Sequence, residues 1–133
     1  RVFEKAGGVR TLRRKAVLLT GYLERLLQQS GLLVEGAGSA ARAATGATLR
    51  LVTPADPRRR GCQLSLKVVP AARASGPDAP PPLTMRALEE RLRARGVVGD
   101  AREPDIMRLA PTPLYNTFTD VWRAVEALKA ELQ

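Results

Sequence analysis

Two prolines decide what the chain can form between residues 106 and 110. Pro104 and Pro111 bracket this apolar stretch, and proline fixes its own φ and lacks a backbone N–H. The stretch is too short for a helix and predicts a strand. Alternation along a strand then assigns its side chains to two faces: Met107 and Leu109 to one, and Ile106, Arg108 and Ala110 to the other.

Arg108 is the one cation in this segment, and its charge requires a partner. An arginine that is buried without water, a carboxylate or a ligand is very costly. It can be a partly exposed side chain that snorkels at the edge of a sheet, or it can bind an anionic ligand. The residues alone leave both interpretations open.

The hydrophobic pattern of the whole chain predicts the order α-β-β-α-β-α. We expect helices at about 9–30, at 85–95 and after Thr117, strands at 47–53, 62–69 and 106–110, and a short extra strand near Val97. The first helix is expected to bury one stripe: Val9, Leu12, Ala16, Leu19, Leu23 and Leu26, widened by Leu18 and Leu27. These elements predict a two-layer α/β (α+β) sandwich with a mostly antiparallel sheet and helices on one face.

Length and composition predict one globular domain over residues 1–133. The chain has 133 residues, of which 44% are hydrophobic. Residues 70–82 are rich in proline, alanine and glycine and are interpreted as a loop insertion. No apolar run approaches the roughly 20 residues that a transmembrane helix needs, and the charged start at Arg1 is unlike a signal peptide. We expect this sequence to be part of a longer polypeptide.

The charge of +9 raises the question of nucleic-acid binding. The cations are mostly arginines scattered along the chain, and base-stacking platforms are scarce because aromatic residues make up only 4%. Clusters such as residues 13–15 are more typical of a solvated helix face. Nucleic acid is therefore the less favoured class of partner.

The absence of histidine excludes several kinds of chemistry within this chain. Histidine general acid–base catalysis and Ser-His or Cys-His nucleophiles are excluded, and a zinc site would need carboxylates almost alone. The single cysteine, Cys62, cannot form an internal disulfide and is expected to be a small buried side chain. No catalytic, cofactor-binding or metal-binding residue is predicted here.

Four blocks of sequence resemble, in order, segments of the kynureninases, which are pyridoxal-phosphate enzymes of the fold type I superfamily. The blocks are Leu-Thr-Gly-Tyr-Leu-Glu at 19–24, Arg-Gly-Cys-Gln-Leu-Ser at 60–65, Arg-Gly-Val-Val-Gly-Asp at 95–100, and Arg-Glu-Pro-Asp-Ile-Met-Arg-Leu-Ala-Pro-Thr-Pro-Leu-Tyr-Asn-Thr-Phe at 102–118. They span nearly the whole chain. The resemblance implies the small C-terminal domain of such an enzyme.

The resemblance also implies a function and a set of partners. Kynureninases cleave kynurenine, or 3-hydroxykynurenine, hydrolytically to anthranilate, or 3-hydroxyanthranilate, and alanine. The arginine that matches Arg108 grips the α-carboxylate of the substrate. Pyridoxal phosphate is expected to bind mainly to an upstream large domain, because no lysine here matches the family's cofactor lysine. A cytoplasmic homodimer is implied for the complete enzyme, and this chain alone is expected to be inactive.

Tyr115 and Asn116 match the Leu-Tyr-Asn of the family and are weaker candidates for substrate binding. Their alternative role is turn geometry, since asparagine tolerates unusual backbone angles. Gln63 and Ser65, on the polar face of the strand at 62–69, are weaker candidates still.

Two further functions remain open. The chain could be an inert remnant that acts in protein association, or a basic module that binds nucleic acid through a contiguous arginine surface.

Overall fold

The computed structural model describes residues 1–34, 46–70 and 83–133. The elements in chain order are α1 (Val2–Lys5), α2 (Gly8–Gln29), β1 (Thr48–Leu51), the 3-10 helix η2 (Pro57–Arg59), β2 (Leu64–Val69), α3 (Met85–Ala94), β3 (Asp100–Arg102), β4 (Ile106–Leu109) and α4 (Phe118–Leu132). The predicted order is confirmed, with α1 and η2 as additions. The proline-rich residues 71–82 lie outside the described ranges, so the predicted loop insertion stays a prediction.

Helix boundaries follow local signals in the sequence. Gly7 and Gly8 have positive φ values of 84° and 82°, which separate α1 from α2. Thr84 begins α3 by accepting a hydrogen bond from the backbone N–H of Ala87 at 3.1 Å. Thr117 and Asp120 form a reciprocal capping box at the start of α4, as their spacing predicts.

The sheet has four antiparallel strands in the order β1-β2-β4-β3. The strands β2 and β4 lie at its centre, so the segment with Arg108 is an inner strand and not an edge. The predicted extra strand forms three residues later than expected, at β3, and pairs with β4 as a hairpin.

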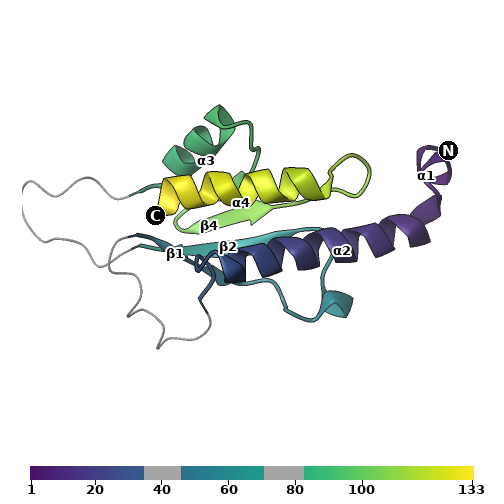
Figure 1. Cartoon of the computed structure of the whole chain (residues 1–133), viewed down its shortest axis with the longest axis horizontal. Helices are drawn as coiled ribbons and strands as arrows, with labels where there is room; N and C mark the ends of the chain where they lie inside the picture. The colour runs from purple at the N-terminus through teal and green to yellow at the C-terminus, as the bar shows by residue number, and fades with distance from the viewer. Residues whose placement is uncertain (35–45, 71–82) are drawn as a thin grey trace, which may run out of the picture.

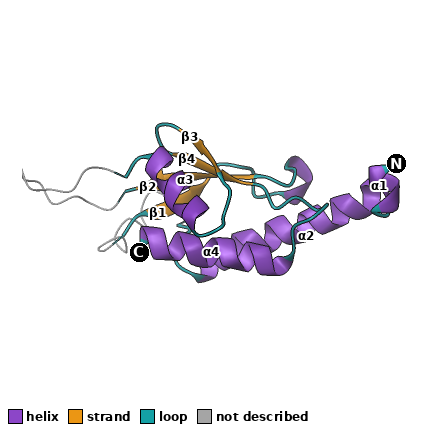
Figure 2. Ribbon diagram, turned by 90° about the horizontal axis from the view of Figure 1, so that it is seen from above, coloured by secondary structure: helices purple, strands orange, loops and turns teal. Residues whose placement is uncertain are grey.

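One face of the sheet is covered by helices. Figure 2 shows α2 and α4 along one side of the strands, and Figure 1 shows α1 and the start of α2 extending beyond the other elements. Tyr22 of α2 meets Phe118 of α4 edge to face, with ring centroids 5.4 Å apart. The two-layer sandwich is confirmed.

A single hydrophobic cluster fills the space between the two layers. Its fully buried members include Leu19, Leu23, Leu27, Leu49, Leu64, Leu66, Leu88, Leu92, Met107 and Leu128. The predicted alternation of β2 and β4 is confirmed because Leu64, Leu66, Met107 and Leu109 all face this core.

Two positions of the predicted helix stripe are wrong. Val9 is 70% exposed and Leu18 is 61% exposed. Val9 lies on the part of α2 that extends past the sheet, and Leu18 lies too far round the helix to reach the core. Within the described ranges, no helix is long and apolar enough to cross a membrane.

Candidate functional site

Arg108 projects from the face of the sheet that the helices leave open. Its neighbours Met107 and Leu109 turn into the core and are 0% and 4% exposed, so alternation sends Arg108 to the opposite side. The guanidinium is therefore near the surface but still constrained, with 30% of the side chain exposed. An arginine of this kind can meet a ligand without leaving a charge buried and unpaired.

A row of side chains crosses the open face at Arg108. The strand register places Asp100 of β3 opposite Arg108 on one side, and Ser65 of β2 opposite it on the other. Directly opposite residues of antiparallel strands have Cβ atoms about 4.5–5.5 Å apart. The row therefore sets a carboxylate on one side of the guanidinium and a hydroxyl on the other.

Asp100 is the ion-pair partner of Arg108. Its Oδ2 accepts a hydrogen bond from Nη2 of Arg108. The same oxygen also accepts from Nη2 of Arg102, at 3.1 Å. The Nε of Arg108 is buried and has no hydrogen-bond partner among the described residues. Two guanidinium groups thus share one carboxylate, which leaves the group of three with one net positive charge.

The open face as a whole is cationic. Arg50 and Lys67 lie on the same face, since they pair in register across β1 and β2, and Lys67 is opposite Ile106. Lys67 forms an ion pair with Asp105 at 2.9 Å. The four cations of these strands exceed the two nearby carboxylates, so this face favours an anionic ligand.

Tyr115 and Asn116 lie in the turn between β4 and α4. The Oδ1 of Asn116 accepts a hydrogen bond from the backbone N–H of Thr112 at 2.8 Å, and its own N–H donates to the Thr112 carbonyl at 2.9 Å. Asn116 therefore fixes the turn. Tyr115 is 72% exposed. A cavity beside Asn116 is lined by core-side residues such as Leu23 and Leu109, and Arg108 is not among its lining.

Of the polar candidates of the β2 region, only one is a neighbour of Arg108 in the described sheet. Ser65 is next to Arg108 in register, whereas Gln63 precedes β2 and takes no part in its ladder. Cys62 is half-buried with a free thiol, so the expected full burial is wrong. It too precedes β2, where the alternation has not yet begun.

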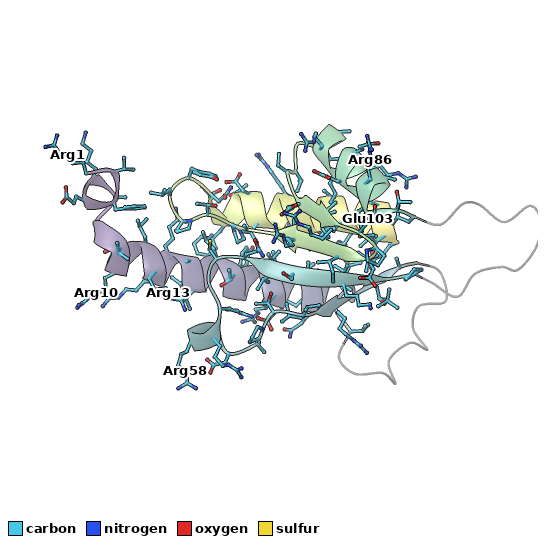
Figure 3. All side chains as sticks on the ribbon, turned by 180° about the vertical axis from the view of Figure 1, so that it is seen from behind. Arg1, Arg10, Arg13, Arg58, Arg86 and Glu103 are labelled. Carbon is cyan, nitrogen blue, oxygen red and sulfur yellow. The ribbon has the colours of Figure 1, made fainter. Side chains whose placement is uncertain are left out.

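Arg13 of α2 and Arg58 of η2 each contact another group of the domain. Figure 3 shows Arg10, Arg13 and Arg58 on one side of the molecule. Arg13 donates to the Pro57 carbonyl, and Arg58 pairs with Asp56 at 2.9 Å. Lys15 donates to the Pro113 carbonyl at 2.9 Å, while Arg14 is exposed, so residues 13–15 lie on a helix face that is only partly solvated.

Sequence patterns do not predict two charged contacts of the structure, Asp100 with Arg108 and Arg60 with Glu24. The Asp100–Arg108 contact depends on the register of the β3–β4 hairpin. The spacing of Asp100 and Arg102 places these two residues on one face of a strand but does not show that Asp100 meets Arg108. The buried ion pair between Arg60 and Glu24, at 2.6 Å, joins residues that are far apart in the chain and carries no spacing signal.

Comparisons with known proteins find similarity to kynureninases. The family model for the kynureninase C-terminal domain matches residues 81–128, which include α3, β3, β4 and most of α4. Kynureninase from Stenotrophomonas maltophilia is 44% identical over 129 residues, covering 97% of this chain and 24% of the relative. Kynureninase from Eremothecium gossypii is 42% identical over 132 residues, covering 99% of this chain and 27% of the relative.

A third kynureninase also matches nearly the whole chain. Kynureninase from Salinispora tropica is 41% identical over 133 residues, covering 99% of this chain and 25% of the relative. The chain thus spans about a quarter of the length of the relatives it matches. It belongs to the kynureninase family, in which it corresponds to the C-terminal domain.

Proposed function

We propose that this domain binds the α-carboxylate of a kynurenine-type substrate through Arg108, as the small domain of a pyridoxal-phosphate-dependent hydrolase. The reaction of the complete enzyme would yield anthranilate and L-alanine from L-kynurenine, and 3-hydroxyanthranilate from 3-hydroxykynurenine. The match to kynureninases along nearly the whole chain supports the family, and the position of Arg108 supports the role.

The single observation that carries the proposal is Arg108 itself. It is a constrained guanidinium on an open, cationic sheet face, and only part of its hydrogen-bonding capacity is taken by Asp100. Guanidinium binds carboxylate with two parallel charge-assisted hydrogen bonds, which fix the orientation of the ligand. Such a contact would hold the substituents of the substrate's Cα in one orientation and would place the reacting bond.

We infer that the described residues do not hold pyridoxal phosphate by themselves. Lys15, Lys67 and Lys129 are each bound to another group of this domain, at 2.9, 2.9 and 3.0 Å. Lys5 lies on the short helix α1, far along the arm from β4 (Figure 1). We therefore assign the cofactor to residues outside this chain, and we expect the isolated 133-residue chain to be inactive.

The family relationship also supports a dimeric assembly and a cytoplasmic location for the complete polypeptide. We propose that the complete polypeptide acts as a cytoplasmic homodimer in tryptophan degradation and NAD biosynthesis. Light scattering of the complete polypeptide would measure its assembly, and a monomer mass would contradict this part of the proposal. Fractionation of the source cells would test the location.

The test of Arg108 uses the complete polypeptide that carries this domain, loaded with pyridoxal phosphate. Arg108→Lys keeps the charge but loses the planar fork, so KM for L-kynurenine should rise about 10- to 100-fold. Arg50→Lys is the matched control, since Arg50 is an exposed arginine on the same face. Release of anthranilate gives the rate. An unchanged KM in Arg108→Lys would overturn the role of this arginine.

The isolated chain provides a second test. Purified residues 1–133, mixed with pyridoxal phosphate and L-kynurenine, should release no anthranilate. Sustained release by this chain would show that the cofactor site has been assigned to the wrong part of the protein.

A further inference from the structure

We propose that Asp100 is a positioning residue, which holds the guanidinium of Arg108 in the orientation that receives the substrate's carboxylate. This inference rests on the proposed function of Arg108 and extends it to the neighbouring strand. Its basis is the cross-strand ion pair between β3 and β4.

An arginine side chain has four flexible torsions, and fixing them costs conformational entropy when a ligand binds. Within the described residues the buried Nε of Arg108 has no hydrogen-bond partner, so no hydrogen bond orients the guanidinium from that side. The hydrogen bond from Nη2 to Asp100 is the polar contact that orients it.

The strand register sets the position of Asp100. It stands opposite Arg108 in the ladder, so the backbone of the β3–β4 hairpin sets the direction from which its carboxylate approaches. The hairpin is held by its own register and by the packing of α3 against β3 and β4. Asp100 is therefore a fixed acceptor, which can preorganise Arg108 before the ligand arrives.

A carboxylate beside the binding arginine would also repel an anionic ligand, and this repulsion would oppose binding. Arg102 donates to the same oxygen of Asp100 at 3.1 Å and so offsets its charge. The set of Asp100, Arg102 and Arg108 keeps one net positive charge. We expect orientation to outweigh repulsion, so that loss of Asp100 weakens binding.

The experiment measures KM and kcat for L-kynurenine in the complete, cofactor-loaded polypeptide. Asp100→Ala should raise KM about tenfold and change kcat less than about twofold, because the cost of orienting Arg108 is a cost of binding that the ground state and the transition state share. Asp100→Glu keeps the carboxylate and should recover part of the lost affinity. In the background of Arg108→Lys, Asp100→Ala should add less than about twofold, since Asp100 acts through Arg108.

Asp105→Asn is the matched control. It removes the carboxylate of another ion pair on the same face, between Asp105 and Lys67, that does not involve Arg108. Its KM should stay within about twofold of the parent value. Thermal unfolding of each variant separates loss of binding from loss of fold.

The outcomes distinguish this inference from the proposed function. If Arg108→Lys raises KM but Asp100→Ala leaves it unchanged or lowers it, the positioning role is overturned and the function of Arg108 stands. If Asp100→Ala raises KM, lowers kcat and lowers the unfolding temperature together, and does so equally in the Arg108→Lys background, its role is structural and the inference fails. If Arg108→Lys has no effect, the proposed function fails first.

Discussion

Arg60 and Glu24 form an ion pair that is almost completely removed from solvent. Nη2 of Arg60 lies 2.6 Å from Oε2 of Glu24, and their side chains are only 3% and 16% exposed. Arg60 also donates to the Pro54 carbonyl at 3.3 Å, and its Nε is buried without a partner in the described structure. The pair joins the connection before β2 to helix α2.

Removal of one partner of this pair should be strongly destabilising. Glu24→Gln leaves the Arg60 charge buried without compensation, and the free energy of unfolding should fall by about 3–5 kcal/mol. Replacement of both groups, as Glu24→Leu with Arg60→Met, should recover most of that loss because no buried charge remains. Urea unfolding measures both effects.

The control for the ion pair is an exposed one. Arg86 and Glu90 of α3 pair at 3.3 Å with side chains 84% and 68% exposed, so Glu90→Gln should cost less than about 0.5 kcal/mol. Equal losses for Glu24→Gln and Glu90→Gln would contradict the buried character of the first pair.

Two neighbouring leucines of α2 should respond differently to truncation. Leu19 is completely buried in the core, so Leu19→Ala should lower the free energy of unfolding by about 2–5 kcal/mol through lost burial and a residual cavity. Leu18 is 61% exposed, and Leu18→Ala should change the free energy of unfolding of the 133-residue chain by less than about 0.5 kcal/mol. Similar losses at both positions would show that α2 is rotated relative to the sheet.

Gly46 should not tolerate a larger residue. A Cβ at this position would overlap the carbonyl oxygen of Leu132 and lie 3.0 Å from the Cα of Gln133, and backbone atoms cannot turn aside. Gly46→Ala should therefore destabilise the domain by about 1–3 kcal/mol.

Gly21 provides the control for Gly46, because nothing lies within 4 Å of its added Cβ. Gly21 is inside α2, where alanine is the better helix former, so Gly21→Ala should stabilise the 133-residue chain by about 0.5–1 kcal/mol. Thermal unfolding compares the two variants. Stabilisation by Gly46→Ala would contradict the close approach of Gly46 to α4.

The capping box of α4 should make stability depend on pH in the acidic range. Hydrogen bonds from the backbone N–H and the hydroxyl of Thr117 hold the pKa of Asp120 below its usual value. A carboxyl whose pKa is lower in the folded state stabilises the fold above its unfolded pKa, near 3.9. This contribution is lost as the pH falls through the lower, folded pKa.

The matching variant is Asp120→Asn, which cannot titrate. The difference in unfolding free energy between the parent and Asp120→Asn should be constant near pH 6 and should shrink as the pH falls below about 4. An NMR titration of the Asp120 carboxyl carbon measures the pKa directly. A midpoint at or above the usual value would refute the stabilising effect of the capping box.

Local patterns predicted most of the secondary structure. The buried positions of β2 and β4, the cap residues Thr84 and Thr117, and the open face for Arg108 all follow from alternation and spacing along the chain. The pattern was wrong at Val9 and Leu18, because periodicity shows a hydrophobic stripe but not where a helix extends past its partner or how far its contact reaches.

The sequence by itself determined the α-β-β-α-β-α order, the family resemblance and the choice of Arg108 as the candidate ligand-binding residue. These depend on residues that are close together in the chain. Only the tertiary structure decided that Arg108 stands on an inner strand beside Asp100, and that Arg60 is buried against Glu24. Both results depend on strand register and helix packing, which bring together groups whose separation in the sequence carries no periodic signal.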